Sequence, residues 1–426
     1  MLLYSPEQVL ALAPDAAAAA ASRAMASPAK WASVGSDDAA AWGEAIGSGS
    51  SPYQTAVDLK DLAYKCSCPS RKLPCKHALG LLFRYAKGEL EGIARPPWVA
   101  EWLEQRAARA TKQSEKATAG PPDIEAAQKR VEKRWSNILA GLDQCESFLV
   151  DAASQGLLAV QSTRSWDQMA ARMVDAQAPG VATLLRRVGA RIGVGEGWAT
   201  TVSGQIGSLA LLNEAARRVD ELDEGLRSDV ATALGIPTRK EDVSGEAVSD
   251  TWDVIGQIVQ VEDRLSTCRT WLKGRSTGRW GMHLTFSVAG QPFDSRPIAG
   301  SALECDARYA PSSWPLRVYL EPGEMVPFRP NAGRRFSSCL DSAADAWAHN
   351  PWLEQVPVHI SKAVLGRDEK SWYAIDEGGE ALPLGGREPW GLLSMTGNVP
   401  CEMFGEWNGR DMRLLAAWGN WGYFGL

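Results

Sequence analysis

Residues 65–78 read Lys-Cys-Ser-Cys-Pro-Ser-Arg-Lys-Leu-Pro-Cys-Lys-His-Ala, and they hold three of the eight cysteines and one of the four histidines of the 426-residue chain. The stretch places four soft metal ligands close together in sequence: Cys66, Cys68, Cys75 and His77. A Cys₃His set is typical of closed structural zinc sites, where four protein side chains complete a tetrahedron and leave no position for water. We expect one structural Zn²⁺ here.

The ligand spacing fits the end of a strand followed by the start of a helix. Cys66 and Cys68 are two residues apart, so in a strand their side chains point to the same face. Cys75 and His77 cannot share one side of a regular helix at that spacing. We therefore expect Cys75 in a loop and His77 in the first helical turn, where the helix N-terminus favours thiolate charge.

The residues around the ligands predict a small β-sheet and one helix. A hairpin is expected over 41–47 and 53–59, a third strand over about 62–66, and a helix over 76–87 that ends at Gly88. The alternative is a redox pair with an unrelated histidine, or simply buried thiols. A disulfide between cysteines two residues apart would be strained, which favours the metal site.

The CxC, spacer, CxH arrangement resembles the SWIM zinc finger over residues 40–88, and Cys66, Cys68, Cys75 and His77 take its ligand positions one for one. The resemblance implies a ββα zinc fold that binds DNA or protein. The whole chain is similar to bacterial SWIM zinc finger family proteins, which are encoded beside MoxR-type AAA ATPases and von Willebrand factor A-domain proteins. A protein partner of one of these two classes is what the resemblance implies.

Basic residues gather around the zinc ligands, although the whole chain carries a net charge of −6. Such a patch suits contacts with phosphates. It also suits compensation of the metal site, because three thiolates on Zn²⁺ leave one negative charge. The candidate contacts to a partner or to nucleic acid are Arg71, Lys72, Lys76, Arg84 and Lys87.

Sequence pattern and the resemblance together predict an α+β multidomain protein. The resemblance implies an N-terminal ββα SWIM-type zinc module, and the pattern predicts a central helical bundle and a C-terminal, mostly antiparallel β domain. We expect N-terminal helices plus the zinc finger in 1–92, a helix and polar linker in 93–122, the bundle in 123–273 and the β-rich domain in 274–426. The chain shows no transmembrane span and no basic signal-peptide region, so we expect a cytoplasmic protein that does not contact membranes.

Two apolar seams with heptad spacing, over 131–152 and 254–272, predict long bundle helices. Weaker helical patterns lie near 164–176, 179–192 and 197–222. Packing within one bundle is the favoured interpretation of the seams, and an intermolecular coiled coil is the alternative.

Strict alternation over 280–288 predicts a half-buried strand, and 316–320 and 356–360 are similar. One helix is expected near 338–348. His283 and His359 fall on such strands without a neighbouring cysteine, so we interpret them as surface or core histidines.

The sequence contains no catalytic motif that we recognise, and a closed zinc site cannot activate water. Residues 193–197 contain three glycines but lack the glycine spacing of a phosphate loop, so we expect a connection between helices there. We predict a non-enzymatic zinc-binding interaction protein that makes protein–protein contacts, as an adaptor to a MoxR-type AAA ATPase system. DNA binding through the basic face is the alternative, and an enzyme with an unrecognised site in the β domain is a third hypothesis. Among the 18 tryptophans, the best candidates for exposed partner anchors are Trp407, Trp418 and Trp421.

Overall fold

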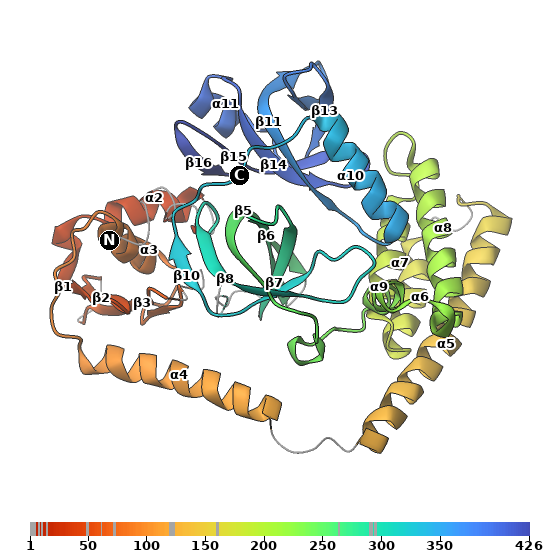
Figure 1. Cartoon of the computed structure of the whole chain (residues 1–426), viewed down its shortest axis with the longest axis horizontal. Helices are drawn as coiled ribbons and strands as arrows, with labels where there is room; N and C mark the ends of the chain where they lie inside the picture. Colours follow the sequence, from red (N-terminus) through yellow and green to blue (C-terminus); the bar gives the residue numbers. More distant parts are fainter. Residues whose placement is uncertain are drawn as a thin grey trace.

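The structure is a computed structural model of the chain. It describes residues 6, 9, 12–13, 16–47, 51–60, 62–70, 74–118, 124–158, 162–262, 265–288, 293 and 296–426, with the backbone alone at 109–118, 124, 126–127, 242 and 262. The zinc module, the helical bundle and the C-terminal β region form three bodies, and the β region lies between the other two (Figure 1). None of the described helices is long and apolar enough to cross a membrane.

The zinc module is a four-stranded antiparallel sheet in the order β1-β2-β3-β4, with two helices packed together beside it. Its elements are α2 (Ala16–Met25), the 3₁₀ turn η1 (Pro28–Lys30), β1 (Trp31–Ser36), β2 (Ala40–Ala45), β3 (Tyr53–Asp58), β4 (Tyr64–Cys66) and α3 (Lys76–Ala86). The predicted hairpin, third strand and helix are confirmed. Strand β1, which lies at the edge of the sheet, has no counterpart in the prediction.

Helix α3 is the centre of this module, because nine of its eleven residues are buried. Gly80 lets α2 approach closely: a Cβ atom at this position would lie 2.5 Å from Cβ of Met25. The apolar residues of α3 with helical i, i+3, i+4, i+7 spacing lie in the core of the module: Leu79, Leu82, Phe83 and Ala86.

A long helix, α4 (Pro97–Thr118), leaves the zinc module and runs toward the bundle (Figure 1). The helix predicted within 93–122 therefore continues as far as Thr118, into the part of this segment where the polar linker was expected. Lys112, Gln113, Glu115 and Lys116 have good helix propensity, which favours this extension of the helix. Residues 119–123 lie outside the described part of the chain.

The bundle contains α5 (Ile124–Gln155), α6 (Thr163–Asp175), α7 (Pro179–Arg191), α8 (Trp198–Arg217) and α9 (Glu224–Leu234), with the 3₁₀ turns η2 (Val219–Glu221) and η3 (Lys240–Asp242) after α8 and α9. The first heptad seam is confirmed as bundle core from Ile138 onward, since Ile138, Leu142, Cys145 and Leu149 of α5 are all buried in it. Val131, the first residue of the predicted seam, is 56% exposed. Residues 193–197 connect α7 to α8, as predicted.

The second heptad seam was predicted wrongly, and so was the domain boundary at residue 273. Residues 254–272 belong to strands β5 (Val248–Glu262) and β6 (Leu265–Gly274), so the bundle helices end at Leu234. The steps of three and four residues fall on a segment rich in valine and isoleucine, whose branched side chains favour strands. Pairing of Glu262 with Leu265 makes the two strands a hairpin.

The first part of the β region is a small barrel. It contains β5, β6, β7 (Trp280–Val288), β8 (Ala302–Tyr309), β9 (Val318–Leu320) and β10 (Glu324–Val326). The strand order is β10-β8-β5-β6-β7, and β9 pairs with β8. The N–H of Met282 in β7 donates to the carbonyl of Leu316 at 2.6 Å, which brings β7 against the segment before β9 and closes the barrel. The strand predicted at 280–288 is confirmed.

The second part of the β region is a six-stranded sheet in the order β13-β12-β11-β14-β15-β16. Its strands are β11 (Val356–Arg367), β12 (Trp372–Ile375), β13 (Ala381–Gly385), β14 (Cys401–Trp407), β15 (Met412–Gly419) and β16 (Gly422–Gly425), and its helices are α10 (Phe336–His349) and α11 (Trp390–Thr396). Trp407 and Trp418 are each 8% exposed, so the prediction that they are surface anchors is wrong. They fill the cores of this sheet and of its junction with the barrel.

The barrel and the second sheet pack directly on each other. Gly256 of β5 permits this approach, because a Cβ atom there would lie 2.8 Å from the ring of Phe404 in β14. Arg269 of β6 bridges the junction: its Nη2 lies 2.9 Å from Oε2 of Glu406, a side chain that is fully buried. Nε1 of Trp271 donates to the same carboxylate at 2.7 Å.

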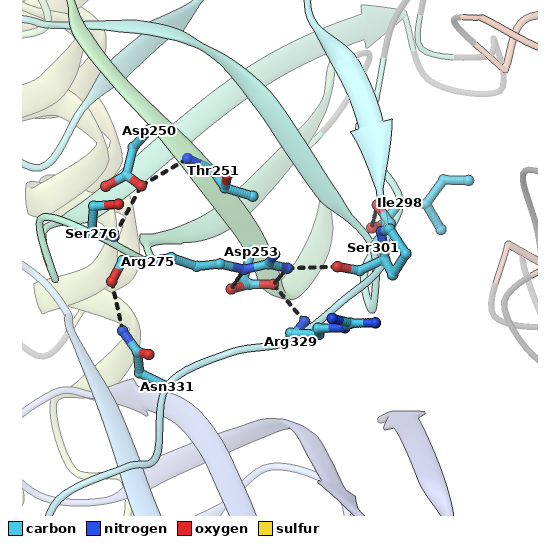
Figure 2. A network of polar contacts seen from close by, with 10 residues as sticks. Asp250, Thr251, Asp253, Arg275, Ser276, Ile298, Ser301, Arg329 and Asn331 are labelled. Carbon is cyan, nitrogen blue, oxygen red and sulfur yellow. Dashed lines mark hydrogen bonds and ion pairs between the residues drawn. The ribbon is translucent and has the colours of Figure 1, made fainter.

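A polar network fixes the loops at one end of the barrel (Figure 2). The carboxylate of Asp253, a residue that is 1% exposed, accepts hydrogen bonds from the guanidinium of Arg275 at 2.7 and 2.8 Å and from the N–H of Arg329 at 3.0 Å. The hydroxyl of Ser301 donates to the carbonyl of Ile298 at 2.7 Å. Ile298 is thereby held where its side chain enters the core of the zinc module.

Candidate metal centre

The four predicted ligands come together in the structure. One ligand atom from each of the four residues lies within 4.8 Å of all the others: Cys66, Cys68, Cys75 and His77. Cys66 is the last residue of β4, where it pairs with Thr55 of β3, and Cys68 follows two residues later. The sheet therefore supplies two thiols at the end of one strand.

The other two ligands lie at the start of α3. Cys75 is the N-cap residue, with extended backbone angles of −76° and 167°, and His77 is the second residue of the helix. This is the loop-to-helix junction that the spacing predicts. Backbone N–H groups near the helix start are free to face a thiolate, and that of Ala78 donates to Cys75.

The ring of His77 presents Nδ1 to the thiols. Nδ1 lies 3.8 Å from Sγ of Cys66 and 4.0 Å from Sγ of Cys75. Zinc bonds of about 2.3 Å to sulfur and about 2.0 Å to nitrogen would place such atoms roughly 3.5 Å apart in a tetrahedron. The group is consistent with one Zn²⁺ ion after a small contraction, and Nδ1 is the nitrogen that would bind it.

Burial makes this a closed centre. Cys75 is 1% exposed and His77 is 4% exposed, while Cys66 and Cys68 are half-buried. Four protein ligands complete the preferred tetrahedral shell of structural zinc. The arrangement can hold a metal, but it offers no open position at which water or a substrate could react.

Two residues of β3 support the ligands, and sequence reasoning missed both. The buried hydroxyl of Thr55 lies 3.2 Å from Sγ of Cys66, and the ring of Tyr53 lies 5.2 Å from that of His77, centroid to centroid. Loss of a residue that holds a ligand in place typically lowers metal affinity about 10–100-fold. Thr55 could have been found from the register of the strands, because it is the cross-strand partner of Cys66.

Hydrogen bonding distinguishes the thiols. A hydrogen bond from Cys75, with further ones from His77 and Thr55, lowers the pKa of Cys66. Sharing a proton with Cys66 raises the pKa of Cys75, and burial raises that of Cys68. Cys66 is therefore the thiol of this group that loses its proton most readily.

The predicted basic face is only partly present in the described residues. Lys76 and Lys87 are exposed, whereas Arg71 and Lys72 lie outside the described residues. The prediction that Arg84 projects from the polar side of the helix is wrong. Its side chain is 8% exposed, and its Nε lies 3.2 Å from Oε2 of Glu89.

The geometry defines a zinc-finger type of protein: a short antiparallel sheet and one helix, joined by a closed Cys₃His group. Residues 53–86, from the start of β3 to the end of α3, match the SWIM zinc finger. Residues 133–234 match the SWIM-associated four-helix bundle domain, which ends with α9. The chain therefore contains a SWIM zinc finger followed by a SWIM-associated helical bundle. No curated protein and no solved structure matches it.

Proposed function

We propose that the protein is a non-enzymatic adaptor, in which one structural Zn²⁺ holds the SWIM finger in a shape that binds another protein. The observation that supports this most is the closed, buried Cys₃His group. Such a centre stabilises a fold and has no free coordination position for chemistry. Zinc thiolates also require reduced cysteines, so we infer a reducing compartment such as the cytoplasm.

The position of α3 favours a protein partner over DNA. A recognition helix must enter the major groove with one face free, but α3 has nine buried residues and packs against both α2 and the sheet. Lys76 and Lys87 are the exposed basic residues on it. DNA binding would therefore rely on phosphate contacts alone, which give weak affinity without sequence specificity.

Charge indicates the kind of surface that the partner would present. Lys60, Lys65, Lys76 and Lys87 are all exposed around the zinc module. A complementary acidic patch on a protein would bind there without the dense charge of DNA. The similarity to SWIM zinc finger family proteins makes a MoxR-type AAA ATPase or a von Willebrand factor A-domain protein the first partners to test.

The experiment compares the full-length protein with its His77→Ala and Lys65→Ser/Lys76→Ser variants in binding assays. The ligands are a purified MoxR-type ATPase, a von Willebrand A-domain protein and a mixed-sequence DNA duplex. We expect saturable binding to one of the proteins, lost in His77→Ala and weakened in the lysine variant. DNA should bind only in the range of about 10⁻⁴–10⁻⁶ M at physiological salt.

Lys362→Ser is the matched control, because Lys362 is an exposed lysine of β11, outside the zinc module. Nanomolar binding of a specific duplex at physiological salt would reverse the order of the two functions. Turnover of a substrate that is unaffected by His77→Ala would instead show that the non-enzymatic assignment is wrong.

A further inference from the structure

A second cluster of ionisable side chains lies where the barrel meets the second sheet. Nζ of Lys273 in β6 lies 3.3 Å from Nδ1 of His359 in β11, and Nε2 of His359 lies 2.9 Å from Oε2 of Glu402 in β14. Glu402 also accepts the backbone N–H of Gly333 at 2.7 Å. Lys273 is 8% exposed and His359 is 3% exposed, so the cluster is buried at the junction.

Hydrogen-bonding rules assign the protons in this chain. A lysine ammonium can only donate, so Lys273 donates to Nδ1 of His359, and the N–H at Nε2 then donates to Glu402. His359 is neutral in this arrangement. Burial lowers its pKa, which also favours the neutral form. The positive charge therefore resides on Lys273, although burial and the nearby Arg334 lower the pKa of this amine.

The cluster lines a cavity of about 210 Å³. The cavity is bounded by the barrel, α10 and the second sheet, and its wall includes Lys273, Trp280, Trp314, Arg334, Cys339 and His359. An apolar cavity of about 150 Å³ is large enough to hold benzene. This one has room for a single aromatic ring together with a small polar group.

Charge in the cavity is unbalanced toward the positive. Lys273 and Arg334 both line it, whereas the carboxylate of Glu402 is engaged by His359 and Gly333. Among the described residues, Nζ of Lys273 has one hydrogen-bond acceptor, and an ammonium has three N–H donors. Glu402 and Asp253 act on Lys273 electrostatically from a distance. An anion in the cavity would take the remaining N–H donors of this buried ammonium directly and would thereby be stabilised.

The aromatic wall is held rigidly. The ring of Trp280 stacks on Phe404 with centroids 5.4 Å apart, and Nζ of Lys273 lies 5.1 Å from the centroid of Trp280. Aromatic faces favour a second flat ring in offset or edge contact. The cavity therefore joins a flat apolar wall to a cationic end.

Cys339 does not give this cavity a nucleophile. Its thiol lies 3.5 Å from the carbonyl of His359, to which it donates, and burial raises its pKa. A protonated thiol is a poor nucleophile. The arrangement is thus one for binding.

We propose that this cavity binds a small aromatic carboxylate, with the carboxylate paired to Lys273 and Arg334 and the ring packed against Trp280 and Trp314. Such a ligand fits the volume, the charge and the aromatic wall at the same time. The site is made by the β region alone and does not depend on the metal centre.

The test is calorimetric titration of the full-length protein with benzoate and with benzamide, its neutral analogue of the same shape. We expect benzoate to bind at least tenfold more tightly than benzamide. Lys273→Met and Arg334→Gln should each weaken benzoate binding about tenfold or more. Lys362→Met is the control and should bind as the wild type does, because Lys362 is outside the cavity and pairs with Glu377.

Arg334 is exposed, so Arg334→Gln leaves the core intact and tests the site even where Lys273→Met folds poorly. Three results would each overturn the proposal: no binding of benzoate to the wild type, equal affinity for benzoate and benzamide, or an unchanged affinity in Arg334→Gln.

Discussion

The zinc module and the C-terminal β region are held together by different interactions. In the zinc module, the end of β4 and the start of α3 meet at three thiols and one imidazole, which a metal ion would join as the thiols release their protons. In the β region, Arg269 and Trp271 both donate to the buried carboxylate of Glu406. The β region thus carries its compensating charges in its own sequence, whereas the zinc module depends on the ion that we propose.

Removing the metal should have the largest effect, because it should unfold the zinc module and leave the β region folded. Structural zinc contributes an apparent binding free energy of about 10–16 kcal/mol in zinc-finger peptides, so chelation, or Cys68→Ser with Cys75→Ser, should unfold the region 40–88. Hydrogen exchange followed by mass spectrometry should show lost protection there and unchanged protection in β5–β16. Cys305→Ser, at a cysteine of β8 outside the metal centre, is the control. Full protection of α3 without metal would show that the module does not need the ion.

Asp253→Asn should have the opposite effect: it should destabilise the β region and leave the metal centre unchanged. It removes one charge from the buried pair with Arg275, and breaking such a pair costs about 3–5 kcal/mol. Urea unfolding should report this loss in the β region, while zinc content stays at one per chain. Glu125→Gln, which removes an exposed pair with Lys129 on α5, should cost less than about 0.5 kcal/mol. Equal effects of the two substitutions would contradict the role assigned to the network in Figure 2.

Thr55→Val tests how much a supporting side chain of the sheet contributes to zinc affinity. Valine keeps the shape and strand preference of threonine but removes the hydroxyl 3.2 Å from Sγ of Cys66. Loss of such a supporting contact lowers metal affinity about 10–100-fold, measurable by competition with a chromophoric chelator. Thr285→Val, on β7, should leave zinc affinity unchanged. An unchanged affinity in Thr55→Val would remove Thr55 from the centre.

Acid should reveal a smaller effect in the β region. Burial would raise the pKa of Asp250, but N–H groups of Ser276, Thr277 and Thr251 and the hydroxyl of Thr277 bond to the carboxylate and lower it overall. A carboxyl whose pKa is lowered by folding stabilises the protein at pH values above its ordinary pKa of about 3.9. This stabilisation disappears as the pH falls through the lower pKa of the folded state.

Asp250→Asn should therefore cost about 1 kcal/mol at pH 7, and the difference from wild type should shrink as the pH falls below about 4. Unfolding measured at several pH values checks this. A difference that stays constant down to pH 3 would mean that the charge of Asp250 does not contribute.

The metal centre was predictable because its information is local. The four ligands lie between residues 66 and 77, and the short strands and the helix around them follow from nearby residues. The cavity cluster was not predictable in this way. Lys273 and His359 are 86 residues apart, and His359 and Glu402 are 43 apart, so only the packing of the barrel on the second sheet joins them.

The errors share one physical cause. A seam spaced by three and four residues identifies apolar positions, but branched side chains and strand pairing decided that 254–272 became β5 and β6. Likewise, Arg84 has the charge of a surface residue, but it lies on a mostly buried helix, α3, where its guanidinium pairs with Glu89. Pattern alone does not tell which face tertiary packing will cover.

Ile298 has a consequence for the order of events during synthesis. This residue, 1% exposed, lies in the core of the zinc module, although α3 ends at Ala86. A ribosome that adds about 5–20 residues per second needs roughly 10–40 s to make the roughly 210 residues in between. During that interval the apolar surface that Ile298 and Met325 cover on the zinc module is exposed to the surroundings of the nascent chain.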